Sequence, residues 1–403
     1  MKCKFPKEFM WGVATSSHQI EGGLRNNWTK WEEGRAKNLT SEQLKYGREN
    51  YLSNSKYSCD SFNHYKEDIQ VIKGLGLKTY RFSIEWSRIE PEKGVFDFEG
   101  LQYYKKLVKE LRENNIEPIV TLWHWTIPVW LEEEGGVLAR EFEKYFLRMC
   151  LQVLESISSD VKYWITINEP EAFSNNSLLK GQWPPNEKNI LKFLNFYAFI
   201  FPSVHKKTYK LIKKFNSKSM VSFAKNNSYI RGYNNSIWNV LVASILRWFI
   251  NYLQIDLVKG YLDYIGLNFY FQNNVGIKGL KNENDKVSDL GWWLKPQSIE
   301  FVLNELHERY KLPILITENG LADSKDIYKN WWIEESVKAM YKSIKKGSKI
   351  LGYCHWSLLD NFEWAEGFWP KFGLVSVDPK TKERNIKQSG KFYSKIVKNN
   401  GII

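Results

Sequence analysis

The chain has 403 residues, of which 43% are hydrophobic and 16% aromatic, so it is long enough to bury a large core. The net charge of +13 comes mainly from lysines scattered along polar helix faces, and no basic stripe alternates with stacking aromatic residues, which argues against a nucleic-acid partner. The four cysteines lie far apart and form no CxxC pair, which argues against a zinc site and against a disulfide framework.

The N-terminal residues, MKCKFPKEFMWG, lack the apolar core of a secretory signal peptide. The longest apolar stretch, Ile237–Ile250, has 14 residues and includes Asn239 and Arg247. Such a stretch is too short and too polar to span a bilayer. We therefore expect a cytoplasmic protein without a membrane partner.

Short apolar runs alternate with helical patterns along the chain, which is typical of a parallel α/β fold. Eight runs are predicted to be strands: 9–15, 77–84, 117–123, 161–168, 219–224, 264–270, 313–318 and 350–356. Apolar residues at helical spacing predict helices in 62–76, 101–115, 141–157, 298–310 and 333–346, and a last helix near Gln388–Lys398. Residues 30–60 are polar and expected to form a loop, and helices within 225–262 are hard to delimit.

Eight strand–helix units predict an α/β fold of the (β/α)8 (TIM) barrel type, formed as a single domain by residues 1–403. No linker, short repeat or low-complexity tract divides the chain. The competing fold, a doubly wound sheet, needs a glycine-rich phosphate-binding turn after the first strand. The only tight glycine cluster there, Glu21-Gly22-Gly23, lacks the required spacing.

Polar residues stand at the carboxyl ends of the predicted strands, where barrel enzymes place their active sites. They occur at seven of the eight strands: His18–Gly22, Arg81, Trp123–Trp125, Asn168–Pro170, Asn268–Tyr270, Glu318–Gly320 and Trp356 with Leu359–Trp364. Agreement among seven strands predicts an active site at this end of the barrel.

Two carboxylates in this set, Glu169 and Glu318, belong to the fourth and seventh strands and are expected to face each other across the barrel mouth. Paired carboxylates in a pocket rich in Trp, Asn, Gln and His suit cleavage of a glycosidic bond, in which one carboxyl acts as acid and the other as nucleophile or base. The alternative is a salt-bridge network at the barrel mouth.

The sequence resembles glycoside hydrolase family 1, the retaining β-glycosidases, along nearly its whole length. The shared motifs run from FMWGVATSSHQIEG through YRFSIEWSRIEP, TLWHW, TINEP, IGLNFY and ITENG to HWSLLDNFEWAEGFWPKFGLV. TINEP followed by ITENG is the most specific pair. The resemblance implies an enzyme that needs no cofactor or metal and acts on a small-molecule β-glycoside or oligosaccharide.

The resemblance also implies roles for single residues. Glu169 would be the general acid/base and Glu318 the nucleophile that forms a glycosyl–enzyme intermediate, with the carboxyl groups about 5 Å apart. Asn168 would bind the sugar 2-hydroxyl, and Arg81 and Tyr270 would keep Glu318 ionised and oriented. The other expected sugar contacts are Gln19, His124, Glu363 and Trp364 at the 3-, 4- and 6-hydroxyls, Trp356 as a stacking floor, and Phe372.

Structural alternatives exist for three of these residues. Arg81 could be the partner of a structural ion pair, His124 a satisfied core histidine, and Trp356 a packing residue. Glu171, which follows the TINEP motif, could contact an outer sugar or cap the next helix.

Some segments depart from the family pattern. The segment between Glu169 and Asn268 is shorter than in most members, which predicts an open cleft or a poorly covered part of the barrel. Asn26-Asn27-Trp28, Trp31-Glu32 and Thr126 also differ from the usual residues, so the aglycone preference cannot be carried over.

We expect hydrolysis of terminal β-D-glucosyl residues, and of β-galactosyl and β-fucosyl residues, by double displacement. One alternative is a sugar-binding barrel without turnover. Another, a 6-phospho-β-glycosidase, is disfavoured because Glu363, Pro370 and Phe372 stand where that branch places Ser, Lys and Tyr. The sequence does not predict the oligomeric state.

Overall fold

The computed structural model describes residues 2–35, 54–234 and 236–403. Most of the polar region 30–60 therefore lies outside the described residues. Its first residues belong to helix α2 (Asn27–Glu33), so the expectation of a loop is wrong there. Asn26 caps this helix, because its side chain accepts a hydrogen bond from Thr29 N and Thr29 Oγ1 accepts one from Asn26 N.

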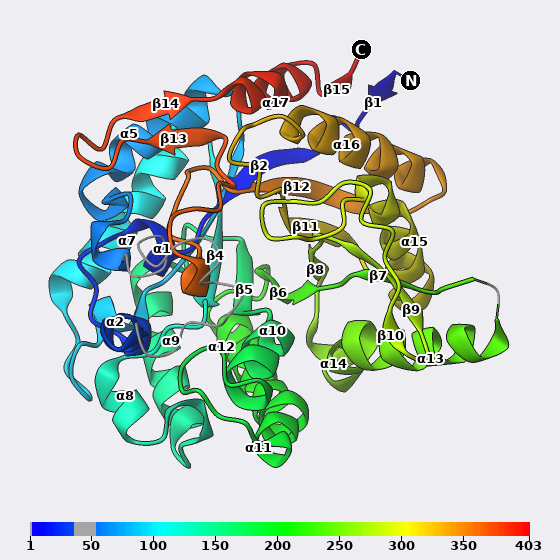
Figure 1. Cartoon of the computed structure of the whole chain (residues 1–403). Coiled ribbons are helices and arrows are strands. Elements are labelled where there is room, and N and C mark those ends of the chain that lie inside the picture. The colour runs from blue at the N-terminus through cyan, green and yellow to red at the C-terminus, as the bar shows by residue number, and fades with distance from the viewer. Residues whose placement is uncertain (1, 36–53, 235) are drawn as a thin grey trace.

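Eight parallel strands close into a barrel, as predicted (Figure 1). Hydrogen bonding follows chain order, and the last strand closes the ring against the first. The strands are β2 (Met10–Ala14), β3 (Thr79–Ser83), β4 (Glu117–Trp123), β5 (Tyr163–Asn168), β6 (Met220–Asn226), β8 (Ile265–Asn268), β11 (Ile314–Asn319) and β12 (Ile350–Trp356). Each overlaps one of the predicted strands.

Helices surround this barrel (Figure 1). The predicted helices correspond to α5 (Ser61–Gly74), α7 (Phe98–Glu113), α9 (Phe142–Ile157), α15 (Ile299–Tyr310), α16 (Lys329–Lys345) and α17 (Gln388–Lys398). A further helix, α12 (Phe201–Phe215), was not predicted, although its buried residues recur at helical spacing. Its five lysines lie between them and keep the outer face polar.

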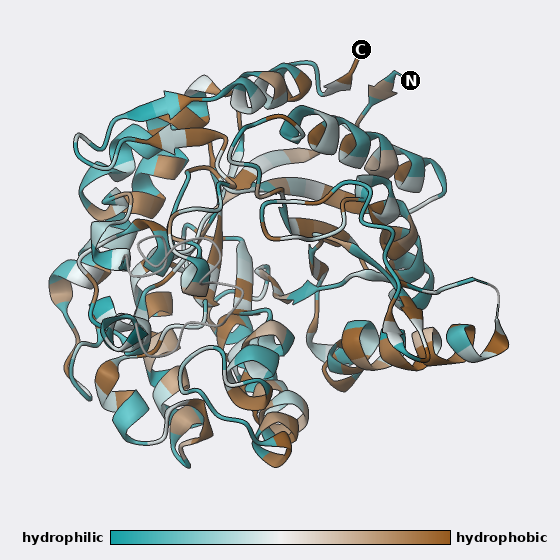
Figure 2. Cartoon of the chain, in the orientation of Figure 1, coloured by the Kyte–Doolittle hydropathy of each residue, from teal (hydrophilic) through white to brown (hydrophobic). Residues whose placement is uncertain are grey.

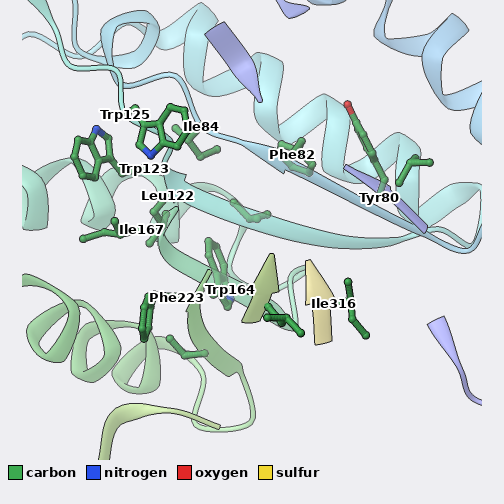
Figure 3. Close-up of a cluster of buried hydrophobic side chains, with 14 of the residues drawn as sticks. Tyr80, Phe82, Ile84, Leu122, Trp123, Trp125, Trp164, Ile167, Phe223 and Ile316 are labelled. Atoms are coloured by element: carbon green, nitrogen blue, oxygen red, sulfur yellow. The ribbon is translucent and has the colours of Figure 1, made fainter. Parts of the chain in front are cut away.

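The core has two layers because successive strand residues point to opposite faces. A smaller apolar cluster, made largely by strand residues such as Ile119, Ile165 and Leu315, fills the barrel interior. A larger cluster lies between strands and helices and includes Phe82 and Trp164 (Figure 3). The strands are buried on both faces, which explains their continuous apolar sequences.

The two termini lie side by side, since β1 (Cys3–Lys4) pairs with β15 (Gly401–Ile402) in antiparallel register (Figure 1). A hairpin of β13 (Val375–Val377) and β14 (Arg384–Ile386) follows the eighth barrel strand.

A small sheet stands beside the barrel, formed by β7 (Tyr229–Gly232), β9 (Gln272–Gly276) and β10 (Gly279–Leu280). Helix α13 (Ile237–Arg247) packs against it. The helical stretch continues through a π-helical turn, Trp248–Tyr252, into α14 (Leu253–Leu257).

This stretch is more extended than the sequence predicts. It covers 21 residues, Ile237–Leu257, with a mean hydropathy of 1.3, and is long and apolar enough by these two measures to cross a membrane. The argument from its length is therefore wrong. Its second half nevertheless belongs to the protein interior, because Asn251 and Gln254 are buried and Asn251 Nδ2 donates to Ser228 O.

Candidate active site

Two carboxylates stand at the carboxyl ends of strands that are separated by β6 and β8 around the barrel. Glu318 lies in β11, and Glu169 follows directly after β5. Only 3% and 4% of their surfaces are exposed, and both side chains line the same cavity. Burying a carboxylate is costly unless it is paired or neutralised. The structure meets this requirement differently for each of the two.

Glu318 is held by a cation and a phenol. Arg81, on β3, donates from Nη1 to one carboxylate oxygen, and Tyr270 Oη donates to the other over 2.5 Å. Arg81 is fully buried and also donates to Thr121 Oγ1 and Asn168 Oδ1. The guanidinium supplies the positive charge that a buried carboxylate needs, and the two donors fix its orientation.

The residues that flank Glu318 fix the end of β11. Thr317 Oγ1 donates to Asn268 Oδ1 on β8 over 2.6 Å. A Cβ atom on Gly320 would lie 1.7 Å from the carbonyl oxygen of Trp356, so only glycine fits at this position. The ITENG motif thus consists of one carboxylate and the neighbours that hold its backbone.

Glu169 is held by amides. Asn268 Nδ2 donates to one of its oxygens over 2.7 Å and Asn226 Nδ2 to the other over 3.3 Å. Burial raises the pKa of Glu169 well above its usual value, and the negative charges of Glu318 and Glu171 raise it further. Its backbone has a φ of +40°, a strained conformation for a residue with a side chain. Its surroundings therefore favour the protonated form of Glu169, whereas those of Glu318 supply a cation.

A buried ion pair next to Glu169 was not foreseen. Lys225 Nζ lies 3.2 Å from Glu171 Oε1, and the backbone N–H of Asn226 donates to the same oxygen over 2.7 Å. Burial lowers the pKa of Lys225 and raises that of Glu171. Strand β6 runs to Asn226, two residues past its predicted end. The sequence signal for this ion pair was a lysine and an asparagine at the end of a buried apolar strand.

Asn168 connects the two carboxylate sites. Its Oδ1 accepts from Arg81 Nη2 over 2.7 Å and from Asn268 Nδ2 over 3.2 Å. Its Nδ2 donates to His124 Nε2 over 3.0 Å. Asn168 therefore contacts a partner of each glutamate. These hydrogen bonds fix the orientation of its side-chain amide.

His124 lines the cavity and has an unused polar atom. Its Nε2 accepts from Asn168, so Nδ1 carries the proton of the neutral ring. Burial, and next the charge of Arg81, lower its pKa well below the usual value. Nδ1 has no hydrogen-bond partner among the described residues. A satisfied core histidine would have one, so the geometry favours a donor kept for a ligand.

The cavity between these side chains has a volume of about 1040 Å³, large for a small-molecule site. Its wall combines aromatic rings with amides and carboxylates, the lining typical of carbohydrate sites. Lining residues include Trp125, Asn175, Asn176, Gln182, Trp183, Trp292, Trp356, Glu363, Trp364 and Phe372.

Glu363 lies at one end of this lining. Its Oε2 accepts from Gln19 Nε2 over 3.0 Å, and Gln19 is also anchored to Phe362 O. Burial raises the pKa of Glu363 to about 8. Burial thus favours the protonated form of this carboxyl more than solvent exposure would. Glu363 consequently repels a phosphate at the 6-position of the sugar less strongly than a fully ionised glutamate would.

Three aromatic residues named from the sequence lie close to His124 and Tyr270. Trp356 and Trp364 each stack on His124, with ring centres 6.0 and 5.8 Å away. Phe372 contacts Tyr270 at 6.2 Å. All three line the cavity. Trp356 is 3% exposed, which fits a cavity floor as well as a packed residue.

Not every predicted residue reaches the cavity itself. Gln19, Arg81 and Asn168 are buried and stand behind the residues that line it. They act on Glu363, Glu318 and His124 through the hydrogen bonds given above. Among the described residues, no group of three or more His, Cys, Asp or Glu side chains is arranged to hold a metal ion.

Comparison with known proteins agrees with this geometry. The sequence model of Glycosyl hydrolase family 1 matches residues 1–253 and 233–402. Beta-glucosidase A from Thermotoga maritima is 31% identical over 99% of both chains. The solved structure of the beta-glucosidase from Thermotoga maritima in complex with castanospermine superposes with a TM-score of 0.90, at 30% identity and 99% coverage of both chains.

A second kind of relative is also similar. The chloroplastic galactolipid galactosyltransferase from Arabidopsis thaliana is 33% identical over 82% of this chain and 57% of its own length. The family match covers the whole barrel and both glutamate motifs. The chain therefore belongs to glycosyl hydrolase family 1 and is a glycoside hydrolase of the β-glucosidase type.

Proposed function

We propose that the protein is a retaining β-glycosidase that hydrolyses terminal non-reducing β-D-glucosyl residues by double displacement. The observation that carries this proposal is the unequal pairing of the two buried carboxylates. Glu318 is bound by the Arg81 cation, whereas Glu169 is bound by neutral amides and has a raised pKa. One is prepared to attack as an anion and the other to give a proton.

In the first step, a carboxylate oxygen of Glu318 forms a bond to the anomeric carbon of the sugar. The bond from that carbon to the glycosidic oxygen breaks as Glu169 gives its proton to this oxygen. The leaving alcohol departs, and Glu318 is now an ester without charge. Tyr270 and Arg81 keep the attacking oxygen in position during this step.

The second step depends on the loss of the negative charge of Glu318 in the first step. The negative charge of Glu318 is one cause of the raised pKa of Glu169, so esterification of Glu318 lowers that pKa. Glu169 can then accept a proton from water while the water oxygen attacks the anomeric carbon and displaces Glu318. The sugar leaves with its original anomeric configuration, and both carboxyl groups return to their starting states.

We propose that the glycone contacts come from Glu363, His124 and Trp364, with Gln19 holding Glu363 in place. A carboxyl and an imidazole can hydrogen-bond hydroxyls of more than one epimer, which supports β-galactosides and β-fucosides as further substrates. The Thermotoga maritima enzyme, 31% identical in this comparison, has been solved with a galacto-hydroximolactam.

Transfer of the glycosyl group to a second sugar is a further candidate. The galactolipid galactosyltransferase relative supports it, because a galactosyltransferase moves a sugar to an acceptor. In this reaction an acceptor hydroxyl takes the place of water in the second step. Products from a β-galactoside, analysed with and without added galactose, separate the two reactions: a disaccharide product shows transfer, and free galactose alone shows hydrolysis.

A panel of nitrophenyl β-glycosides tests the proposal. We expect nitrophenol release from the glucoside, slower or comparable release from the galactoside and fucoside, and much slower release from the 6-phosphoglucoside. Glu318→Gln is the matched control, since it keeps the shape of the site. A sugar-binding barrel without turnover predicts no release that depends on Glu318, and a 6-phospho-β-glycosidase predicts the opposite order of rates. Either result would overturn the proposal.

A further inference from the structure

A helix beside the cleft presents an apolar face to solvent. In α13 and the turn after it, Trp238, Leu241, Ile245 and Trp248 recur at spacings of three, four and three residues, and Ile237 adjoins them. Between 46% and 77% of each side chain is exposed. We call these five residues the α13 ridge. Single exposed apolar side chains are common, but an aligned row of five with two tryptophans marks a contact surface.

The opposite side of α13 already has a partner. Ala243, Leu246 and Ile250 pack against Ile230 and Val275 of the small sheet. Figure 2 shows hydrophobic residues along the length of α13, which lies on the outer edge of the molecule. A helix that is apolar on both sides is normally buried on both. The ridge is therefore built for a contact outside the isolated chain.

The tip of the β9–β10 hairpin extends this surface. Ile277 and Leu280 are 67% and 63% exposed, and Ile277 N donates to Asn239 Oδ1 of α13 over 3.0 Å. Lys278 and Lys281 are exposed beside them. The surface thus combines apolar and aromatic side chains with basic ones. The next acidic residues along the chain, Glu283 and Asp285, both face Lys295.

We propose that the α13 ridge and the hairpin tip dock on a membrane surface that carries anionic lipids. The tryptophans and aliphatic side chains would enter the boundary between headgroups and acyl chains, where amphipathic helices bind. Lys278 and Lys281 would meet the lipid phosphates. This proposal differs from the sequence-based expectation that the protein has no membrane partner.

A second copy of the chain fits this surface less well. A two-fold contact places the same patch on both partners, so it would bring Lys278 and Lys281 close to their own equivalents. Each molecule also carries a net charge of +13. A negatively charged membrane complements these charges, whereas a second copy repels them.

Docking through the α13 ridge would also set the position of the cleft relative to the membrane surface. The ridge continues directly into Phe249 and Ile250, which line the cavity wall. A bound ridge therefore holds one rim of the cleft near the lipid surface. The buried Asn251 and Gln254 keep the second half of the helical stretch in the protein, so the contact is with the surface and does not span the bilayer.

Flotation with lipid vesicles tests the proposal. We expect the protein to bind vesicles of phosphatidylcholine mixed with phosphatidylglycerol, and to bind pure phosphatidylcholine much more weakly. The double variant Ile237→Ser/Trp238→Ser should bind the mixed vesicles at least tenfold more weakly. Lys278→Gln and Lys281→Gln should each lower binding about fivefold at low salt and have little effect at high salt.

Phe98→Ser is the matched control, because Phe98 is 72% exposed and lies on α7, away from the ridge. It should leave vesicle binding unchanged. Hydrolysis of a soluble glycoside should be the same in all these variants, which shows that they fold. Absence of vesicle binding, or binding that the ridge variant retains, would overturn the proposal. So would a dimer in analytical ultracentrifugation that the ridge variant alone dissociates, since the occupant would then be a second copy.

Discussion

The ends of β5 and β11 carry the same functional group in opposite surroundings. At the end of β11, a guanidinium and a phenol donate to Glu318. At the end of β5, two amides donate to Glu169, and the charges of neighbouring carboxylates raise its pKa. The comparison teaches that the role of each carboxylate is set by its partners, because both residues are glutamates and both are almost wholly buried.

Removing the carboxylate at the charged end should have the largest effect. Glu318→Gln leaves no anion to attack the anomeric carbon, so kcat should fall by about 10⁴-fold or more. Steady-state rates on an aryl β-glucoside measure it. Added formate should partly restore turnover in Glu318→Ala, because it supplies an external carboxylate. A variant with near-normal rates would show that Glu318 is not the nucleophile.

Removing the carboxyl group at the neutral end should have a smaller effect that depends on the substrate. Glu169→Gln cannot donate a proton, so kcat/KM should fall by about 10²- to 10⁴-fold for alkyl or phenyl glucosides. The loss should be much smaller for dinitrophenyl glucoside, whose leaving group needs no proton. An equal loss for both substrates would contradict the role of acid.

Breaking the ion pair should lower stability as well as activity. Arg81→Met leaves the Glu318 carboxylate buried without its cation, which should cost about 3–5 kcal/mol of unfolding free energy. Chemical denaturation measures this change. The double variant Arg81→Met/Glu318→Gln has no unpaired charge and should recover most of the loss. Additive losses in the two variants would show that the pair is not coupled.

The smallest expected change concerns the proton on Glu169. Its protonated form is active in the first step, so activity falls as pH rises through its pKa. Glu171 is one of the charges that raise that pKa. Glu171→Gln should therefore move the alkaline limb of kcat/KM to lower pH, while Glu133→Gln, at an exposed position 62% accessible, should not move it. A shift to higher pH would contradict the placement of Glu171 beside the acid.

The sequence was sufficient for the barrel and for most of its mouth. Buried parallel strands leave continuous apolar runs, and the polar residues that follow them mark one end of the barrel, so Glu169, Glu318, Arg81 and Tyr270 could be placed without coordinates. Contacts between side chains from different strands were harder to predict from the sequence. The pairing of Lys225 with Glu171 joins residues 54 positions apart, and no periodic pattern in the sequence relates them.

The region around α13 was the least predictable. Its residues are apolar on two opposite sides, so the apolar pattern does not separate a buried face from an exposed one, and it could not fix the bounds of the helix. The role of the small sheet, which covers one side of α13, depends on pairing between β7 and β9, strands that are about 40 residues apart in the chain. Only the folded structure shows which side of α13 remains open.

Trapping of the intermediate tests the central claim most directly. A 2-deoxy-2-fluoro-glucoside with a good leaving group should glycosylate the enzyme and slow the second step, so that the adduct can be located by mass spectrometry of proteolytic peptides. The unequal pairing of the two carboxylates predicts a single fluoroglucosyl ester on Glu318. An adduct on Glu169, or turnover of the substrate without any covalent adduct, would contradict it.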